Sequence, residues 1–130
     1  MTQGKKTILI VDDIPDIREE LVYMLKEHGY HVEQADDGAR ALKVFTTQTI
    51  DLLVTDILMP VMDGIELTVA AKELVPGLKV ILISGGGRQV KGSSDFDYLE
   101  TSKLLTNPNY VLKKPFQPEE FLSVVDSLFA

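Results

Sequence analysis

Short, fully apolar runs that alternate with helix-like stripes are the feature that most constrains the fold. Residues 8–11, 52–54 and 80–83 contain only aliphatic side chains. A strand that is apolar on both faces is typical of a parallel sheet covered by helices on both sides. The third such run is preceded by a segment, residues 67–74, whose apolar residues recur at helical spacing. This alternation predicts a single α/β domain.

The same patterns predict five strands with helices between them. Strands are expected at Thr7–Val11, His31–Ala35, 50–55, Lys79–Ser84 and Tyr110–Lys113. The apolar stripes predict the inward residues of the helices: Ile17, Leu21, Met24, Leu25 and His28, then Ala39, Leu42 and Phe45, then Leu67, Ala70, Ala71 and Leu74, then Phe121, Val124, Val125 and Leu128. Right-handed crossovers then favour a doubly wound (βα)5 fold with a flavodoxin-like strand order, 2-1-3-4-5.

The helix ends and the domain bounds follow from turn chemistry. Asp13 followed by Pro15 is expected to cap the first helix. We expect residues 1–6 to form a flexible tail and residues 7–130 to form the domain. Residues 85–109 are the least regular part, and only about 95–105 has a weak helical stripe. A long loop in a compact domain usually serves a function.

Composition excludes several classes of function. The chain has no cysteine, which rules out disulfides, thiol catalysis and cysteine-bound zinc. A formal net charge of −7 disfavours direct binding to nucleic acid. No apolar run is long enough to span a bilayer or to serve as a signal sequence, so no membrane partner and a cytoplasmic location are expected.

Polar residues follow four of the expected strands. Asp12 and Asp13 follow the first, Asp56 the third, Ser84 ends the fourth, and Lys114 follows the fifth. In a parallel sheet the functional crevice lies beyond the carboxyl ends of the strands. Carboxylates that meet there repel one another unless a cation neutralises them. Oxygen ligands without histidine or cysteine suit a hard cation, and we expect Mg²⁺ rather than Ca²⁺.

A lysine and a hydroxyl beside such a site complete a clamp for phosphoryl oxygens. In that arrangement Asp56 is the nucleophile and forms an acyl phosphate. Plainer interpretations stay open, because Asp12 and Asp13 can be helix caps and Ser84 a strand-end hydroxyl. The pair Asp63 and Gly64 reads as a turn and helix cap in either case.

The chain resembles the receiver domain of bacterial two-component response regulators, of the chemotaxis-regulator type. The matching pieces are residues 8–13, 56–64, 83–84 and 114–116, and the stretch D-x-x-M-P-x-M-D-G from Asp56 is the most specific. The resemblance implies a signalling switch that accepts a phosphoryl group from a histidine kinase or histidine phosphotransfer protein. It also implies a downstream protein target or output domain, which responds to changes in the fourth helix and fifth strand.

The resemblance also assigns roles to individual residues. Asp56 is the phosphoacceptor, Asp13 a direct Mg²⁺ ligand, Asp12 a ligand that often acts through water, and the backbone carbonyl of Leu58 a further ligand. Ser84 contacts the phosphoryl group. Lys114, which precedes a cis Pro115, pairs with the phosphoryl oxygens. The first helix, with Ile14, Ile17 and Leu21, is the docking region for the kinase.

This chain departs from the family pattern in three places. Gly85 stands where the family usually has alanine, and the stretch from Ser84 to Lys114 is longer than usual. Val111 occupies the position of the family's switch aromatic. Tyr110 lies one residue earlier and is expected to face the opposite side of the sheet.

Two other functions compete with the regulatory switch. One is an aspartate-nucleophile phosphatase, but Leu58 stands where such an enzyme needs its general acid, two residues after Asp56. The other is a receiver-like interaction module that never carries phosphate, for which the acceptor residues would be unnecessary. We therefore expect a regulatory domain that promotes only its own phosphorylation and slow dephosphorylation.

Overall fold

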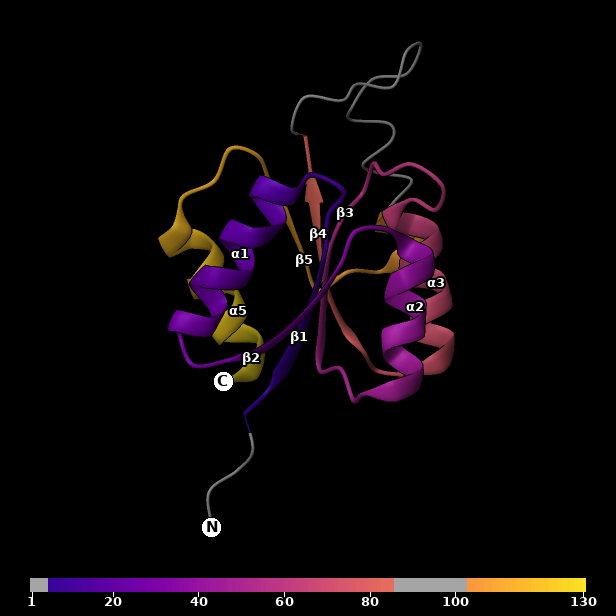
Figure 1. Ribbon diagram of the computed structural model, residues 1–130, viewed down its shortest axis with the longest axis horizontal. Coiled ribbons are helices and arrows are strands. Elements are labelled where there is room, and N and C mark those ends of the chain that lie inside the picture. The colour runs from indigo at the N-terminus through magenta and orange to yellow at the C-terminus, as the bar shows by residue number, and fades with distance from the viewer. Residues whose placement is uncertain (1–4, 86–102) are drawn as a thin grey trace.

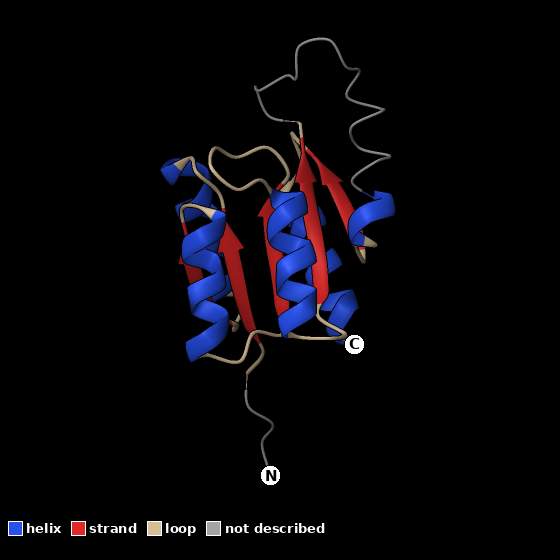
Figure 2. Ribbon diagram, turned by 90° about the vertical axis from the view of Figure 1, so that its right-hand side faces the viewer, coloured by secondary structure: helices blue, strands red, loops and turns tan. Residues whose placement is uncertain are grey.

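The computed structural model describes residues 5–85 and 103–130. Its strands form one parallel sheet of order β2-β1-β3-β4-β5, which confirms the predicted flavodoxin-like topology. The strands are β1 (Thr7–Val11), β2 (His31–Ala35), β3 (Leu52–Asp56), β4 (Lys79–Ser84) and β5 (Tyr110–Lys113). All of them point in one direction, so their carboxyl ends meet at one edge (Figure 2).

Helices cover both faces of the sheet (Figure 1). α1 (Pro15–Glu27) and α5 (Pro118–Phe129) lie on one face, and α2 (Gly38–Thr47) and α3 (Gly64–Leu74) lie on the other. Each face has its own apolar core, because alternate side chains of a strand point to opposite sides. In β1, for example, Leu9 packs toward α2 and α3, whereas Ile8 and Ile10 pack toward α1 and α5.

Some predicted details are wrong. The N-cap of α1 is Ile14, which has no side-chain cap, so Asp13 is not the capping residue. β3 begins at Leu52 rather than at residue 50, because the side chain of Asp51 accepts the Thr7 N–H instead. Three residues expected to face inward, His28, Ala39 and Leu74, are exposed. Two neighbours that the stripes had omitted, Val22 and Ala41, are buried.

The region after β4 is described only in part. Residues 86–102, which hold most of the helix expected at about 95–105, lie outside the described residues. Residues 103–106 are helical, one position beyond the expected end. The tail expected at residues 1–6 is described only at Lys5 and Lys6, both of which are exposed. None of the described helices has the length and apolar content that crossing a membrane requires.

The carboxyl-terminal end of α5 is attached to the turn that follows α1. Asp126 accepts hydrogen bonds from the Tyr30 hydroxyl and from His28 Nε2, the latter at 2.8 Å. These bonds, that of Tyr30 first, hold the pKa of Asp126 below its usual range. The two helices that border one side of the candidate site are thereby joined at the opposite end of the sheet (Figure 1).

Candidate functional site

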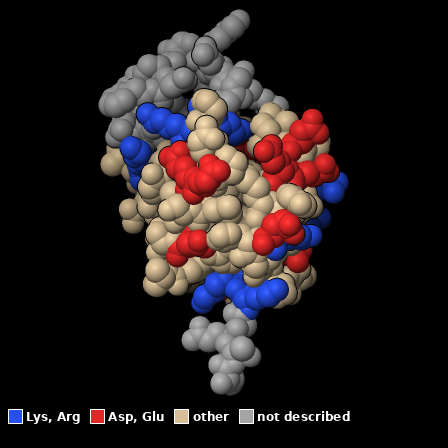
Figure 3. Space-filling model, turned by 90° about the vertical axis from the view of Figure 1, so that its left-hand side faces the viewer, with Lys and Arg blue, Asp and Glu red and all other residues tan. Residues whose placement is uncertain are grey.

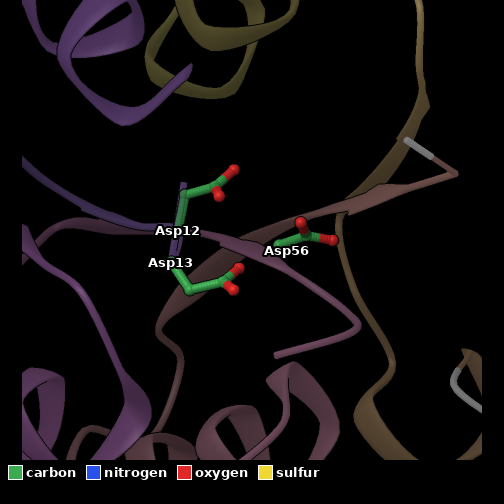
Figure 4. Close-up of side chains that lie close together, drawn as sticks. All are labelled: Asp12, Asp13 and Asp56. Atoms are coloured by element: carbon green, nitrogen blue, oxygen red, sulfur yellow. The ribbon is translucent and has the colours of Figure 1, made fainter. Parts of the chain in front are cut away.

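Three carboxylates gather at the carboxyl ends of β1 and β3, as the sequence predicts (Figure 4). Asp12 and Asp13 follow β1, and Asp56 is the last residue of β3. One carboxylate oxygen from each lies within 4.8 Å of the others. Asp12 is 1% exposed and Asp56 is 5% exposed. This much buried negative charge needs compensation from a nearby cation.

Lys114 provides part of that compensation. Its Nζ lies 3.3 Å from Asp56 Oδ2 and 3.7 Å from Asp12 Oδ2, and its side chain is 11% exposed. The backbone N–H of Lys114 donates to the Ser84 carbonyl at 2.9 Å, which fixes the lysine beside the end of β4. The peptide bond from Lys114 to Pro115 is cis, as the family resemblance implied. Lys113 is exposed, so Lys114 is the lysine of the site.

The surroundings of Asp56 raise the pKa of its carboxyl group. Burial is the main cause, and the charge of Asp12 adds to it. The Lys114 ammonium and a hydrogen bond from the Leu58 backbone N–H act in the opposite direction but do not cancel the effect. The folded protein therefore disfavours the charged form of Asp56, and one lysine does not neutralise the three acids.

Asp12 leaves one oxygen available for a ligand. Its Oδ1 accepts the Ile14 N–H at 2.9 Å, and its backbone N–H donates to the Ala35 carbonyl at 3.3 Å. Its Oδ2 is buried and makes no hydrogen bond. A buried carboxylate oxygen without a hydrogen bond, among further carboxylates, fits a hard divalent cation with oxygen ligands.

The loop after β3 packs tightly against Asp56. Asp63 caps α3 by accepting the Glu66 N–H at 2.9 Å, which confirms the predicted turn and cap. The N–H of Gly64 donates to the Ile57 carbonyl at 2.8 Å. A Cβ placed on Gly64 would lie 2.2 Å from the carbonyl oxygen of Asp56. Glycine is therefore needed here to allow this close backbone approach.

The tip of that loop is strained. Val61 has a φ of +73° and is 87% exposed. The Met62 N–H donates to the Pro60 carbonyl at 2.9 Å, which closes a three-residue turn around Val61. A γ-turn with positive φ is uncommon, and a β-branched side chain makes it costlier.

We expect Val61→Gly to raise the free energy of unfolding by about 1 kcal/mol. Relief of the strain outweighs the larger backbone entropy that glycine has in the unfolded chain. Val61→Ala, which keeps a Cβ at positive φ, should gain less. Urea unfolding curves of the three proteins test this order, and a less stable Val61→Gly would show that the turn is not strained.

Gly85 and Val111, two residues that depart from the family pattern, lie directly after β4 and within β5. Ser84 is half-buried at the end of β4, and Gly85 has a φ of +86°. Val111 packs against the core on the α2 and α3 face. Tyr110 is 41% exposed and precedes it in the strand, which confirms that the two side chains face opposite sides. No aromatic ring therefore occupies the position of Val111.

Sequence reasoning missed one residue that contacts the site. Arg18 donates from Nη1 to the backbone carbonyl of Asp12 at 2.8 Å and from Nε to Gln34 Oε1 at 2.9 Å. A signal was present, because a cation in the first turn of a helix opposes the helix dipole. A cation at this position is expected to make another contact that offsets its unfavourable interaction with the helix dipole.

Comparison with known proteins decides the family. The profile of the response regulator receiver domain matches residues 8–126. The chain belongs to this family. The receiver domain is 37% identical over 123 residues to the response regulator receiver protein CpdR of Brucella abortus, covering 95% of this chain and 96% of that protein.

Solved structures agree with the fold of this receiver domain. A CheY-like receiver domain protein from Methanospirillum hungatei is 28% identical, with a TM-score of 0.83, and the match covers 96% of this chain and 94% of that one. The response regulator TrrA from Thermotoga maritima, solved in complex with Mg²⁺-BeF, is 31% identical with a TM-score of 0.78, covering 95% and 98%. Some curated relatives are longer, and the chain spans only 20% of the length of two of them.

Proposed function

We propose that this receiver domain is a phosphorylatable switch in which Asp56 accepts a phosphoryl group from the phosphohistidine of a histidine kinase or phosphotransfer protein. One observation carries the proposal. Asp56 is buried, lies 3.3 Å from the Lys114 ammonium, and shares a pocket with Asp12 and Asp13. A carboxylate beside both a cation and a metal-like cluster of acids suits phosphoryl transfer.

The acids supply the ligands that Mg²⁺ prefers. Asp12, Asp13 and Asp56, with the Leu58 backbone carbonyl, would hold the ion, and the buried Oδ2 of Asp12, which makes no hydrogen bond, supports this donor set. Bound Mg²⁺ would neutralise the carboxylates and the incoming phosphoryl oxygens. The complex of TrrA with Mg²⁺-BeF supports the same choice of ion.

The chain's own residues perform the transfer. A carboxylate oxygen of Asp56 attacks the phosphorus in line, a P–O bond forms, and the P–N bond to the donor histidine breaks. The electron pair of that bond returns to the imidazole nitrogen. The Lys114 ammonium and the Ser84 hydroxyl donate hydrogen bonds to the phosphoryl oxygens. Water later hydrolyses the acyl phosphate slowly, so the domain acts as a regulator rather than as an enzyme with its own substrate.

The receiver domain has an apolar groove at which the donor protein would dock. A cavity of about 280 Å³ lies between α1 and the segment that joins β5 to α5. Ile17, Leu21, Met24 and Phe116 line it, and Lys114 connects it to the site. Figure 3 shows that acidic side chains are distributed around uncharged surface on the face that carries α1 and α5. An amphipathic helix of a kinase with basic residues at its edge fits this surface.

The phosphorylated state would act on a downstream protein or output domain through the surface near β5. Leu104, Leu105 and Tyr110 are 85%, 59% and 41% exposed there. Added charge at Asp56 would shift the surface formed by residues 103–106 and β5 between two arrangements. With Val111 in place of an aromatic ring, this shift does not depend on the rotation of an aromatic side chain. The cytoplasmic location and the lack of direct contact with nucleic acid stay predictions from the sequence.

Phosphorylation can be tested without the partner. We expect the protein, incubated with Mg²⁺ and acetyl phosphate, to gain one phosphoryl group per chain by intact mass, and hydroxylamine to remove it. Asp56→Asn should remain unlabelled. The matched control is Asp63→Asn, which makes the same change in the same loop and should be labelled normally, because asparagine also caps helices.

The outcomes separate the competing functions. An unlabelled wild-type protein would support the interaction module, and labelled Asp56→Asn would show that another residue is the acceptor. Rapid release of phosphate over many turnovers would support the phosphatase. Leu58, two residues after Asp56, argues against that last outcome because it offers no general acid.

A further inference from the structure

We propose that Arg18 is a positioning residue for the metal site. It holds Asp12 through the backbone carbonyl and so directs the Asp12 carboxylate oxygen that makes no hydrogen bond, Oδ2, into the pocket. The inference rests on the proposed function of Asp12 as a Mg²⁺ ligand, and the experiment below separates the two.

Asp12 is held at all but one of its polar atoms. Its backbone N–H donates to Ala35, its Oδ1 accepts from Ile14, and its carbonyl accepts from Arg18 Nη1 at 2.8 Å. Its Oδ2 makes no hydrogen bond and lies 3.7 Å from Lys114 Nζ. Because three contacts fix the orientation of Asp12, the fourth atom is presented to a ligand without further ordering. Of those three contacts, only the one from Arg18 comes from a charged side chain.

The geometry of Arg18 is specific to a guanidinium. Nη1 donates to Asp12 while Nε donates to Gln34 Oε1 at 2.9 Å, so one planar group joins the end of β1 to the edge strand β2. Lysine carries the same charge but has no rigid fork of donors that reaches both acceptors. The charge and the geometry of the residue can therefore be tested separately.

The place of Arg18 in α1 supports a role beyond helix stability. It lies in the first turn, where its N–H donates to the Ile14 carbonyl. A positive side chain at this end opposes the helix dipole and costs roughly 0.3–1 kcal/mol. The hydrogen bonds to Asp12 and Gln34 offset that cost. Arg18 thus makes the helix less stable at this end, while its side chain contacts the site.

Positioning and simple charge have opposite consequences for metal binding. If Arg18 acted only as a nearby positive charge, its removal would strengthen Mg²⁺ binding because it would leave the pocket more negative. If Arg18 positions Asp12, its removal weakens Mg²⁺ binding even though the pocket becomes more negative. Loss of an outer contact of a metal ligand typically costs 10- to 100-fold in affinity.

The test measures Mg²⁺ dissociation constants by calorimetry on the wild-type protein, Arg18→Met, Arg18→Lys and Gln34→Leu. We expect Arg18→Met to weaken Mg²⁺ binding about tenfold. Arg18→Lys should weaken it nearly as much, and Gln34→Leu less. Arg40→Met is the matched control, because Arg40 lies in the first turn of α2, is exposed, and pairs only with Asp36 and Asp37 among the described salt bridges. This control variant should bind Mg²⁺ as the wild type does.

A second readout separates positioning from general damage to the fold. In labelling by acetyl phosphate, the Mg²⁺ concentration for half-maximal rate should rise in Arg18→Met, while the rate at saturating Mg²⁺ stays within about twofold of the wild type. Unchanged or tighter Mg²⁺ binding in Arg18→Met, or wild-type binding in Arg18→Lys, would overturn the positioning role. A wild-type protein that binds no Mg²⁺ would instead overturn the proposed metal site itself.

Discussion

Gly64→Ala should lower the free energy of unfolding by about 3 kcal/mol or more. The new Cβ would lie 2.2 Å from the Asp56 carbonyl oxygen and 3.0 Å from both the Asp56 carbonyl carbon and Ile57 Cα. All three atoms belong to the backbone, so no side chain can rotate to relieve the overlap. The loop must move away from β3, which breaks the hydrogen bond from Gly64 to Ile57.

Gly77→Ala is the matched control for this prediction. Gly77 has a φ of +85°, but a Cβ added there would meet nothing within 4 Å, whereas Gly64 is constrained by space. Alanine at Gly77 should therefore cost only about 1 kcal/mol, the usual penalty of a positive φ. Urea unfolding of both variants measures the difference. Equal decreases in the free energy of unfolding for the two variants would mean that the loop at Gly64 moves at little cost and does not hold Asp56 in place.

The same displacement should impair the site. Because Gly64 packs against the backbone carbonyl of Asp56, moving the loop changes the position of the Asp56 carboxylate, the proposed acceptor. We expect Gly64→Ala protein that remains folded at low temperature to be labelled by acetyl phosphate more slowly than Gly77→Ala protein. The comparison links a packing contact to the proposed chemistry.

The fold was predictable because three of its strands, β1, β3 and β4, contain runs that are apolar on both faces. β1, β2, β4 and β5 have the expected bounds, and in β1 and β4 an apolar run with polar neighbours marks both ends. β3 was displaced because Asp51, which the alternation placed inside the strand, uses its carboxylate to accept the Thr7 N–H. The inward-facing residues of a helix were predicted less accurately where the apolar stripe is short. In α2, for example, Ala41 rather than Ala39 is buried.

The acidic pocket was predictable from topology alone. Parallel strands bring their carboxyl ends together, so residues at or just after the ends of β1, β3 and β5 lie near one another there. Contacts made by long side chains follow no such rule. Arg18 reaches a backbone carbonyl, and Val61 adopts a positive φ in a turn that proline and methionine close. Neither feature produces a periodic pattern in the sequence. The position of Arg18 in the first turn of its helix, which is unfavourable for a cation, was the one indication of its contact.

We expect Asp56→Asn to raise the free energy of unfolding of the metal-free protein by about 1–2 kcal/mol. The pKa of Asp56 is raised in the folded state, chiefly by burial. At neutral pH the side chain is ionised in the unfolded chain, so folding must bury that charge at a cost. Asparagine has a similar size and no charge. Lys114 keeps Asp12 as a partner at 3.7 Å, so the substitution does not leave it unpaired.

Mg²⁺ should reverse the order of stability. A cation that binds only the folded wild-type protein adds about 2.7 kcal/mol at a hundred times its dissociation constant. Asp56→Asn lacks one of the three carboxylates and should gain less. Thermal unfolding with and without Mg²⁺ tests the crossover, and Asp63→Asn, outside the acidic pocket, should follow the wild type in both conditions. A metal-free Asp56→Asn protein less stable than the wild type would show that the attraction between Asp56 and Lys114 exceeds the cost of burying the charge. In that case the site would be a source of stability, whereas the raised pKa of Asp56 indicates that burying this carboxylate lowers the free energy of unfolding.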